Sequence, residues 1–191
     1  MSGAASKPTP LLLLGAREAH RLRSDDLHET PPQAVEALLA KEQFAGPVWE
    51  PACGRGAISR VLESHGHTVI STDLVERGYG EGRVDFLLEF AARAPNIITN
   101  PPYKLSCDFA EHATRLVPGK VAFLCRLAWL AGLRRRPLFE ARLSRVLIFA
   151  KRLPMMHRDG WDGPRSTSAI DFAWFIFDPT HMGPISLGYL P

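Results

Sequence analysis

Short apolar runs alternate along the chain with segments whose apolar residues recur at helical spacing. Seven runs have the length of strands: 47–50, 67–72, 84–88, 96–99, 120–125, 146–150 and 169–177. Most lack a clean alternation of apolar and polar residues, which is typical of strands buried on both faces. Helices are expected at about 57–65 and 106–116. Strands that alternate with helices predict a doubly wound α/β sheet, which binds ligands beyond the carboxyl ends of its strands.

The chain has the length and apolar content for one domain with a substantial core, because 46% of its 191 residues are hydrophobic. Residues 1–24 are expected to form a flexible N-terminal tail, and residues 25–191 the domain. The segment 153–168 is rich in Gly, Pro, Arg, Met and His and is the longest irregular segment inside the domain. Such a segment is typical of a functional loop.

Charge and cysteine content narrow the choice of partners. The net charge of +3 permits binding to nucleic acid without demanding it. The three cysteines are far apart, so neither a disulfide framework nor a cysteine metal site is expected. The four-residue leucine run at 11–14 is too short to span a membrane. We therefore expect a cytoplasmic protein without a metal or a membrane partner.

A glycine-containing loop follows the first predicted strand and opens a helix. It reads Glu50, Pro51, Ala52, Cys53, Gly54, Arg55 and Gly56. Glycines at Gly54 and Gly56 allow a tight turn and a close approach of the backbone to a ligand, and the helix behind them offers free amides. The loop lacks the third glycine of the dinucleotide fingerprint, so NAD is disfavoured.

Acidic and proline-rich segments follow the later strands. Asp73 comes just after the second predicted strand, where a carboxylate can accept hydrogen bonds from the hydroxyls of a ribose. Asp85 and Phe86 belong to the short third predicted strand. Asn100, Pro101, Pro102 and Tyr103 follow the fourth. The Asn100 side-chain oxygen and the Pro101 carbonyl are placed to accept both hydrogens of one amino group, and the Tyr103 ring to stack on the planar group that carries it.

The order of these motifs resembles that in class I S-adenosylmethionine-dependent methyltransferases of the adenine-N6 group. It runs from EPACGRG through Asp73 and Asp85-Phe86 to NPPY. The similarity is greatest to the small phage- and prophage-type DNA adenine methyltransferases and covers about residues 25–177. The resemblance implies a single Rossmann-like domain with a seven-stranded, mostly parallel sheet whose last strand is antiparallel. It also implies S-adenosylmethionine as cofactor, DNA as partner and a bacterial or phage-infected cell as setting.

The resemblance assigns roles to individual residues. Thr30 and Pro31, on a helix before the first strand, and residues 50–56 would hold the methionine end of the cofactor. Asp73 would bind its ribose, and Asp85 with Phe86 its adenine. Asn100 to Tyr103 would bind and polarise the target amine, Asn100 also contacting the cofactor. Besides Tyr103, further substrate contacts are expected from the residues themselves and not from the resemblance. Arg135, Arg158 and Arg165 lie in basic segments after the fifth and sixth strands, and Trp161 lies in the irregular loop.

The sequence leaves several alternatives open. NPPY also occurs in RNA adenine-N6 methyltransferases and in protein glutamine-N5 methyltransferases. A non-catalytic binding subunit that keeps the methyltransferase fold is a third reading, disfavoured because both motifs are intact. No separate target-recognition domain is visible, so DNA recognition is expected to be short or relaxed in sequence. Monomer and homodimer both remain open.

Overall fold

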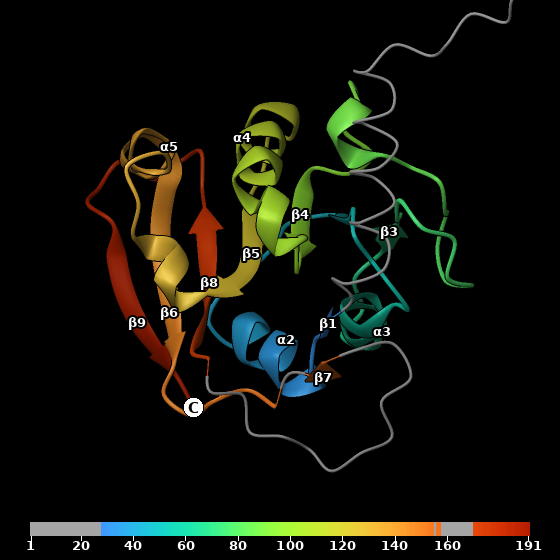
Figure 1. Cartoon of the computed structure of the whole chain (residues 1–191), viewed down its shortest axis with the longest axis horizontal. Coiled ribbons are helices and arrows are strands. Elements are labelled where there is room, and N and C mark those ends of the chain that lie inside the picture. The colour runs from blue at the N-terminus through green and yellow to red at the C-terminus, as the bar shows by residue number, and fades with distance from the viewer. Residues whose placement is uncertain (1–27, 155, 158–169) are drawn as a thin grey trace, which may run out of the picture.

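The computed structural model describes residues 28–154, 156–157 and 170–191. Its central element is a seven-stranded sheet in the order β3-β2-β4-β5-β8-β6-β9 (Figure 1). The strands are β2 (Val48–Glu50), β3 (Val69–Ser71), β4 (Asn96–Thr99), β5 (Val121–Arg126), β6 (Leu143–Phe149), β8 (Phe172–Phe177) and β9 (Ser186–Leu190). The N-terminal tail expected at 1–24 and most of the loop expected at 153–168 lie outside the described residues.

Strand directions agree with the predicted fold class. Strands β3, β2, β4 and β5 pair in parallel with one another, and β9 pairs in parallel with β6. Strand β8, which corresponds to the seventh predicted strand, is antiparallel to both of its neighbours, β5 and β6. The prediction of a doubly wound, seven-stranded and mostly parallel α/β sheet is therefore confirmed.

Helices cover both faces of the sheet. The buried residues of α2 (Pro32–Leu39) and α3 (Ala57–Ser64) pack on one face, against Ile98 of β4 and Trp174 of β8. Those of α4 (Ser106–Leu116) and α5 (Arg136–Arg142) pack on the other. The short 3-10 helices η1 (Phe86–Leu88), η2 (Tyr103–Leu105) and η3 (Leu127–Leu130) complete the described helices. This arrangement leaves the ends of the strands open to form a site.

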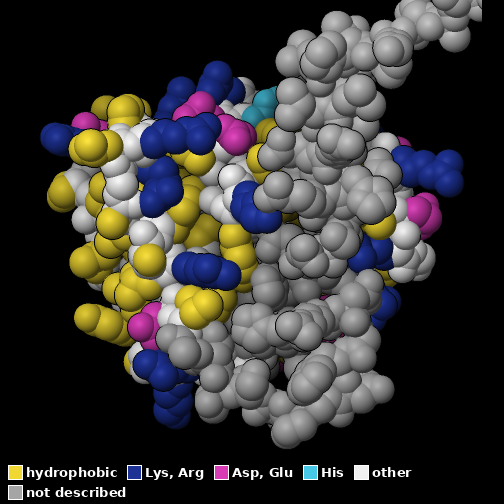
Figure 2. Space-filling view, in the orientation of Figure 1, with side chains coloured by type: hydrophobic (Ala, Val, Ile, Leu, Met, Phe, Trp, Pro, Cys, Tyr) yellow, Lys and Arg dark blue, Asp and Glu magenta, His cyan; other side chains and the backbone are white. Residues whose placement is uncertain are grey.

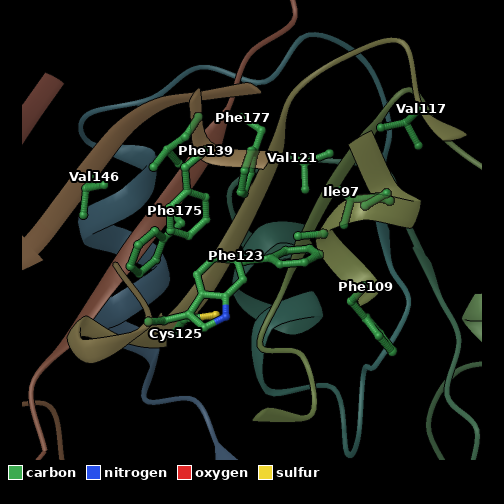
Figure 3. Packing of buried hydrophobic residues seen from close by; sticks show 14 of the residues in the cluster. Ile97, Phe109, Val117, Val121, Phe123, Cys125, Phe139, Val146, Phe175 and Phe177 are labelled. Carbon is green, nitrogen blue, oxygen red and sulfur yellow. The ribbon is translucent and has the colours of Figure 1, made fainter. Parts of the chain in front are cut away.

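The core is continuous through the central strands. All six residues of β8 are buried, and the indole nitrogen of Trp174 donates to the Ala34 carbonyl of α2 at 2.8 Å. On the opposite face, Phe123, Phe139, Phe175 and Phe177 form an aromatic cluster (Figure 3). Aromatic side chains bury large apolar areas, so this layer fixes β5, β8 and α5 together.

The prediction of a strand at 84–88 was wrong. The chain there forms the 3-10 helix η1, which the Asp85 carboxylate caps by accepting from the Leu87 amide at 3.0 Å. A side chain that bonds to its own following backbone competes with strand pairing. The seventh strand of the sheet is instead β9, at the opposite edge, which the sequence pattern did not predict.

A separate two-stranded sheet joins distant parts of the chain. In it β1 (His28–Glu29) pairs antiparallel with β7 (Met156–His157).

Within the described ranges, no helix is long and apolar enough to cross a membrane. The same residues contain no group of three or more His, Cys, Asp or Glu placed to hold a metal ion.

Candidate active site

A cavity of about 290 Å³ lies at the carboxyl ends of β2, β3 and β4. Predicted residues that line it are Thr30, Glu50, Pro51, Ala52, Cys53, Gly54, Asp73, Asp85, Phe86, Asn100 and Pro102. Pro31, Gly56, Pro101, Tyr103 and Arg135 are described but do not line it. Residues far apart in the sequence thus meet at one place because parallel strands end at the same edge of the sheet.

The glycine loop is held in a backbone conformation that suits glycine. Gly54 and Gly56 have φ angles of 56° and 81°, in the left-handed region. A Cβ at Gly56 would clash with the Tyr79 ring, so the chain after β3 packs directly over the loop. The left-handed backbone therefore favours glycine at both positions, and the close approach of Tyr79 requires it at Gly56.

Asp73 fastens the loop to the neighbouring strand. Its carboxylate accepts from the Gly54 amide and, through its other oxygen, from the Val75 amide, each at 2.8 Å. Each carboxylate oxygen has two lone pairs, so these bonds leave acceptor capacity toward the cavity. Asp73 is thus placed to accept from hydroxyl groups of a ligand.

Glu50 is a buried acid in the cavity wall. Its side chain accepts from the Ser59 amide at 2.8 Å and also from the Ser59 hydroxyl. Burial raises the pKa of Glu50 to about 8, and the bonds from Ser59 oppose this only in part. The carboxyl is therefore largely protonated at neutral pH, and a positively charged ligand beside it would favour its ionised form.

This burial predicts a pH-dependent stability. The folded pKa is about 8 and the ordinary value is 4.5, so between these values the folded protein binds a proton that the unfolded chain releases. The free energy of unfolding should fall as pH rises through this window, by at most about 1.4 kcal/mol per pH unit. Below about pH 4.5 this contribution is fully present.

The measurement is denaturant unfolding of the wild type and Glu50→Gln at several pH values from 5 to about 9. The variant should lack this component, so its stability relative to the wild type should rise with pH. Glu36→Gln, at an exposed carboxyl on α2, is the matched control. Parallel pH profiles for wild type and Glu50→Gln would contradict the assignment.

The floor of the cavity is apolar. Phe86 is buried, with its ring centroid 5.1 Å from that of Trp49 and 4.9 Å from that of Phe109. Leu87, Leu105 and Phe109 also line the cavity. A flat apolar ligand group is suited to this floor, with the Asp85 carboxylate at its side.

Asn100 follows β4 directly and reaches across to the entry of α2. Its amide nitrogen donates to the Thr30 hydroxyl at 3.2 Å, which orients the side chain. Pro101 is buried and Pro102 lines the cavity. The proline pair thus leads the chain out of the cavity into η2, which begins at Tyr103.

Tyr103 lies beside the cavity. Its half-buried ring has its centroid 6.2 Å from that of Phe172, at an interplanar angle of 43°. The guanidinium carbon of Arg126 lies 4.6 Å from the centroid of the same ring. The ring therefore already has an apolar neighbour and a cationic one.

The predicted substrate residues are only partly described. Arg135 is half-buried and its guanidinium donates to the Ala131 carbonyl, so it folds back on its own turn. Its neighbour Arg134 pairs with Asp108 of α4 at 2.5 Å. Arg158, Trp161 and Arg165 lie outside the described residues.

Several lining residues were missed by the sequence analysis. These are Glu29, Ala57, Ile58, Leu74, Val75, Arg77, Val84, Leu87, Leu105 and Phe109. Arg55 also lines the cavity, and it belongs to the loop 50–56 that was expected to hold the methionine end of the cofactor. Most of the others lie on segments whose path over the cavity depends on tertiary packing.

No protein-family model matches the sequence, and no curated protein matches it. Solved structures do. One is described as a class I S-adenosylmethionine-dependent methyltransferase from Listeria monocytogenes (TM-score 0.60, 14% identity, 84% of this chain and 65% of that one). A second is described as a modification subunit of a type I restriction enzyme from Vibrio vulnificus YJ016 (TM-score 0.56, 14% identity, 92% of this chain and 48% of that one).

A third is described as an RNA methyltransferase from Pyrococcus horikoshii (TM-score 0.54, 15% identity, 77% of this chain and 80% of that one). The chain thus spans just under two thirds of the Listeria protein and about half of the Vibrio protein. At these identities the likeness is one of fold. The fold is that of class I S-adenosylmethionine-dependent methyltransferases.

Proposed function

We propose that this chain is an S-adenosylmethionine-dependent N-methyltransferase that methylates the N6 amine of adenine in DNA, with short or relaxed sequence specificity. The observation that carries the proposal is that the glycine loop, Asp73, Asp85 and Asn100 all line one cavity. These residues come from four separate segments of the chain, and they combine a cofactor-type loop with an amine-binding motif.

The cavity fits the chemistry of the cofactor. Thr30 and the loop from Pro51 to Arg55 would hold the cationic methionine end, beside the buried carboxyl of Glu50. Asp73 would accept from the ribose hydroxyls. Asp85 and the apolar floor formed by Phe86 would take the adenine ring. When bound, the cofactor supplies an electrophilic methyl group on a sulfonium.

The chain itself has to bind and orient the amine. The Asn100 side-chain oxygen and the Pro101 carbonyl would each accept one hydrogen of the amine, which aims its lone pair toward the cavity. Fixed dipoles of this kind lower the barrier without reorganisation. No general base is needed in this proposal, because the nitrogen becomes acidic once it is methylated and then releases its proton.

DNA is the favoured polymer for three reasons. The Vibrio relative is described as a modification subunit of a restriction enzyme, and the motif order resembles DNA adenine methyltransferases. Exposed cations also lie on η2, at Lys104, and at the end of β5, at Arg126. Figure 2 shows further Lys and Arg side chains over α4 and α5, with acidic side chains beside some of them. A base in duplex would have to be flipped to reach Asn100.

Sequencing of DNA methylated by the purified chain tests the specificity. Few elements remain to read base edges beyond those that build the cavity, and each good bidentate contact is worth about 1–3 kcal/mol of discrimination. We expect methylated adenines in a short or relaxed sequence context. A long, strictly defined motif would contradict the proposal of minimal recognition.

Tyr103 variants test whether the target is an aromatic base that stacks on the ring. If the ring stacks on a base, Tyr103→Phe should remain active. Tyr103→Ala should lose a stacking energy of about 1–3 kcal/mol, which lowers kcat/KM by about 5–150-fold. Tyr189→Ala, at an exposed tyrosine on β9, is the matched control and should be neutral. Equal activity of the Phe and Ala variants would favour a target without an aromatic ring, such as a glutamine side chain.

A further inference from the structure

Arg126 has an unusual place at the end of β5. The five preceding residues of this strand are buried, whereas Arg126 is exposed. It is paired in register with Phe172 of β8, so the two side chains leave the same face of the sheet. Tyr103, which opens η2 after the proline pair, packs near both of them. Arg126 therefore reaches the ring of Tyr103, the last residue of the proposed amine-binding motif.

The Tyr103 ring is supported on its core side. Phe172 is almost fully buried and belongs to the apolar cluster against which Tyr103 packs. The Arg126 guanidinium lies over the ring, with 4.6 Å between its central carbon and the ring centroid. A planar guanidinium and a planar base both stack on an aromatic face. The cation thus contacts the ring in the way that a target base would.

Arg126 is also free of competing partners in the part of the chain that the structure describes. Its guanidinium forms no ion pair or hydrogen bond with any described residue. Asp171 lies close to Arg126, because its carbonyl accepts a hydrogen bond from the amide of the next residue, Leu127. The Asp171 carboxylate, however, pairs with Arg152 at 3.4 Å. The neighbouring Lys104 is exposed as well. The edge next to Tyr103 therefore carries positive charge that is available to an anion.

We propose that Arg126 is a substrate-binding residue that covers the Tyr103 ring in the empty site and yields it to the target base. The guanidinium then pairs with a DNA phosphate beside the flipped nucleotide. A charge-assisted, bidentate contact with phosphate suits an arginine better than a lysine. Exchange of one planar partner for another keeps the ring covered in both states. This inference rests on the proposed action on DNA.

The test compares the wild type with Arg126→Gln, Arg126→Lys and the control Arg115→Gln. Arg115 is an exposed arginine in the last turn of α4, at the end of the helix away from η2. The substrate is a short adenine-containing DNA duplex, and KM for DNA, kcat and the salt dependence of kcat/KM are measured. Binding of S-adenosylhomocysteine by calorimetry reports on the cofactor cavity separately.

Arg126→Gln should raise the KM for DNA about tenfold, and it should reduce the slope of log(kcat/KM) against log(salt) by about 1. Affinity for S-adenosylhomocysteine should not change. Arg126→Lys should keep the wild-type salt slope, because it retains the positive charge. Its KM for DNA should lie between those of the wild type and Arg126→Gln, because lysine cannot make the bidentate contact of a guanidinium. Arg115→Gln should resemble the wild type.

A wild-type KM and salt slope in Arg126→Gln would overturn this inference alone, provided that the wild type methylates DNA. A parallel loss of S-adenosylhomocysteine affinity would also overturn it, because Arg126 would then act on the cofactor cavity. If the wild type methylates no DNA at all, the proposed function fails and this inference fails with it.

Discussion

Replacement of Asn100 by alanine is expected to lower the rate of methyl transfer by about 10²–10³-fold, while the affinity for S-adenosylmethionine changes little. The reason is that Asn100 supplies one of the two proposed acceptors for the amine hydrogens, whereas many other residues line the cofactor cavity. Loss of a single preorganised group of this kind costs on the order of 3 kcal/mol in the barrier. Single-turnover kinetics measures the rate, and calorimetry measures cofactor affinity.

Thr30→Val separates this role from a structural one. Asn100 donates to the Thr30 hydroxyl at 3.2 Å, so part of any effect arises from the orientation of the amide. Valine removes that acceptor with little change of volume and leaves the Asn100 oxygen in place. We expect a smaller loss of rate in Thr30→Val than in Asn100→Ala. A nearly normal rate in Asn100→Ala would falsify the role in amine binding.

The second large effect is expected at Gly54. In the wild type, S-adenosylmethionine at about 100 times its Kd should stabilise the fold by about 2.7 kcal/mol and raise Tm by about 5–10 °C. Gly54→Val should abolish that rise. The residue has a φ of 56° and lines the cavity, so a β-branched side chain both strains the turn and fills ligand space.

Gly66→Val is the matched control for backbone strain. Gly66 has a φ of 83°, and a Cβ there meets nothing within 4 Å. This variant should be destabilised yet keep the rise in Tm with S-adenosylmethionine. If Gly54→Val also keeps the rise, or if NAD and not S-adenosylmethionine stabilises the wild type, the proposed cofactor is wrong.

The sheet could be predicted well where strands are buried on both faces. β5 and β8 are nearly continuous apolar runs, and such runs have few alternatives to a central strand. β4 is also buried throughout, although it begins with Asn96 and ends with Thr99. The run at 84–88 looked similar but formed η1, because the Asp85 side chain closes a turn. β9 escaped prediction because it is an edge strand, with Leu187 and Tyr189 largely exposed.

The candidate site divides in the same way. The loop at 50–56, Asp73 and Asn100 follow strand ends, so their meeting at one edge follows from the topology alone. Residues such as Leu74 and Arg77 lie on an irregular segment that carries no periodic signal. The contact of Arg126 with Tyr103 depends on the register between β5 and β8 and on the path of η2, neither of which can be read from sequence spacing.

Transfer of a labelled methyl group from S-adenosylmethionine to separate pools of DNA, RNA and protein tests the central claim most directly. The pools are digested after incubation with the purified chain, and the labelled nucleosides and amino acids are identified. We expect label in DNA, as N6-methyladenine, and its loss in the Asn100→Ala variant. Label confined to adenine in RNA or to glutamine in protein, or no label in any pool, would contradict the proposed DNA adenine methyltransferase activity.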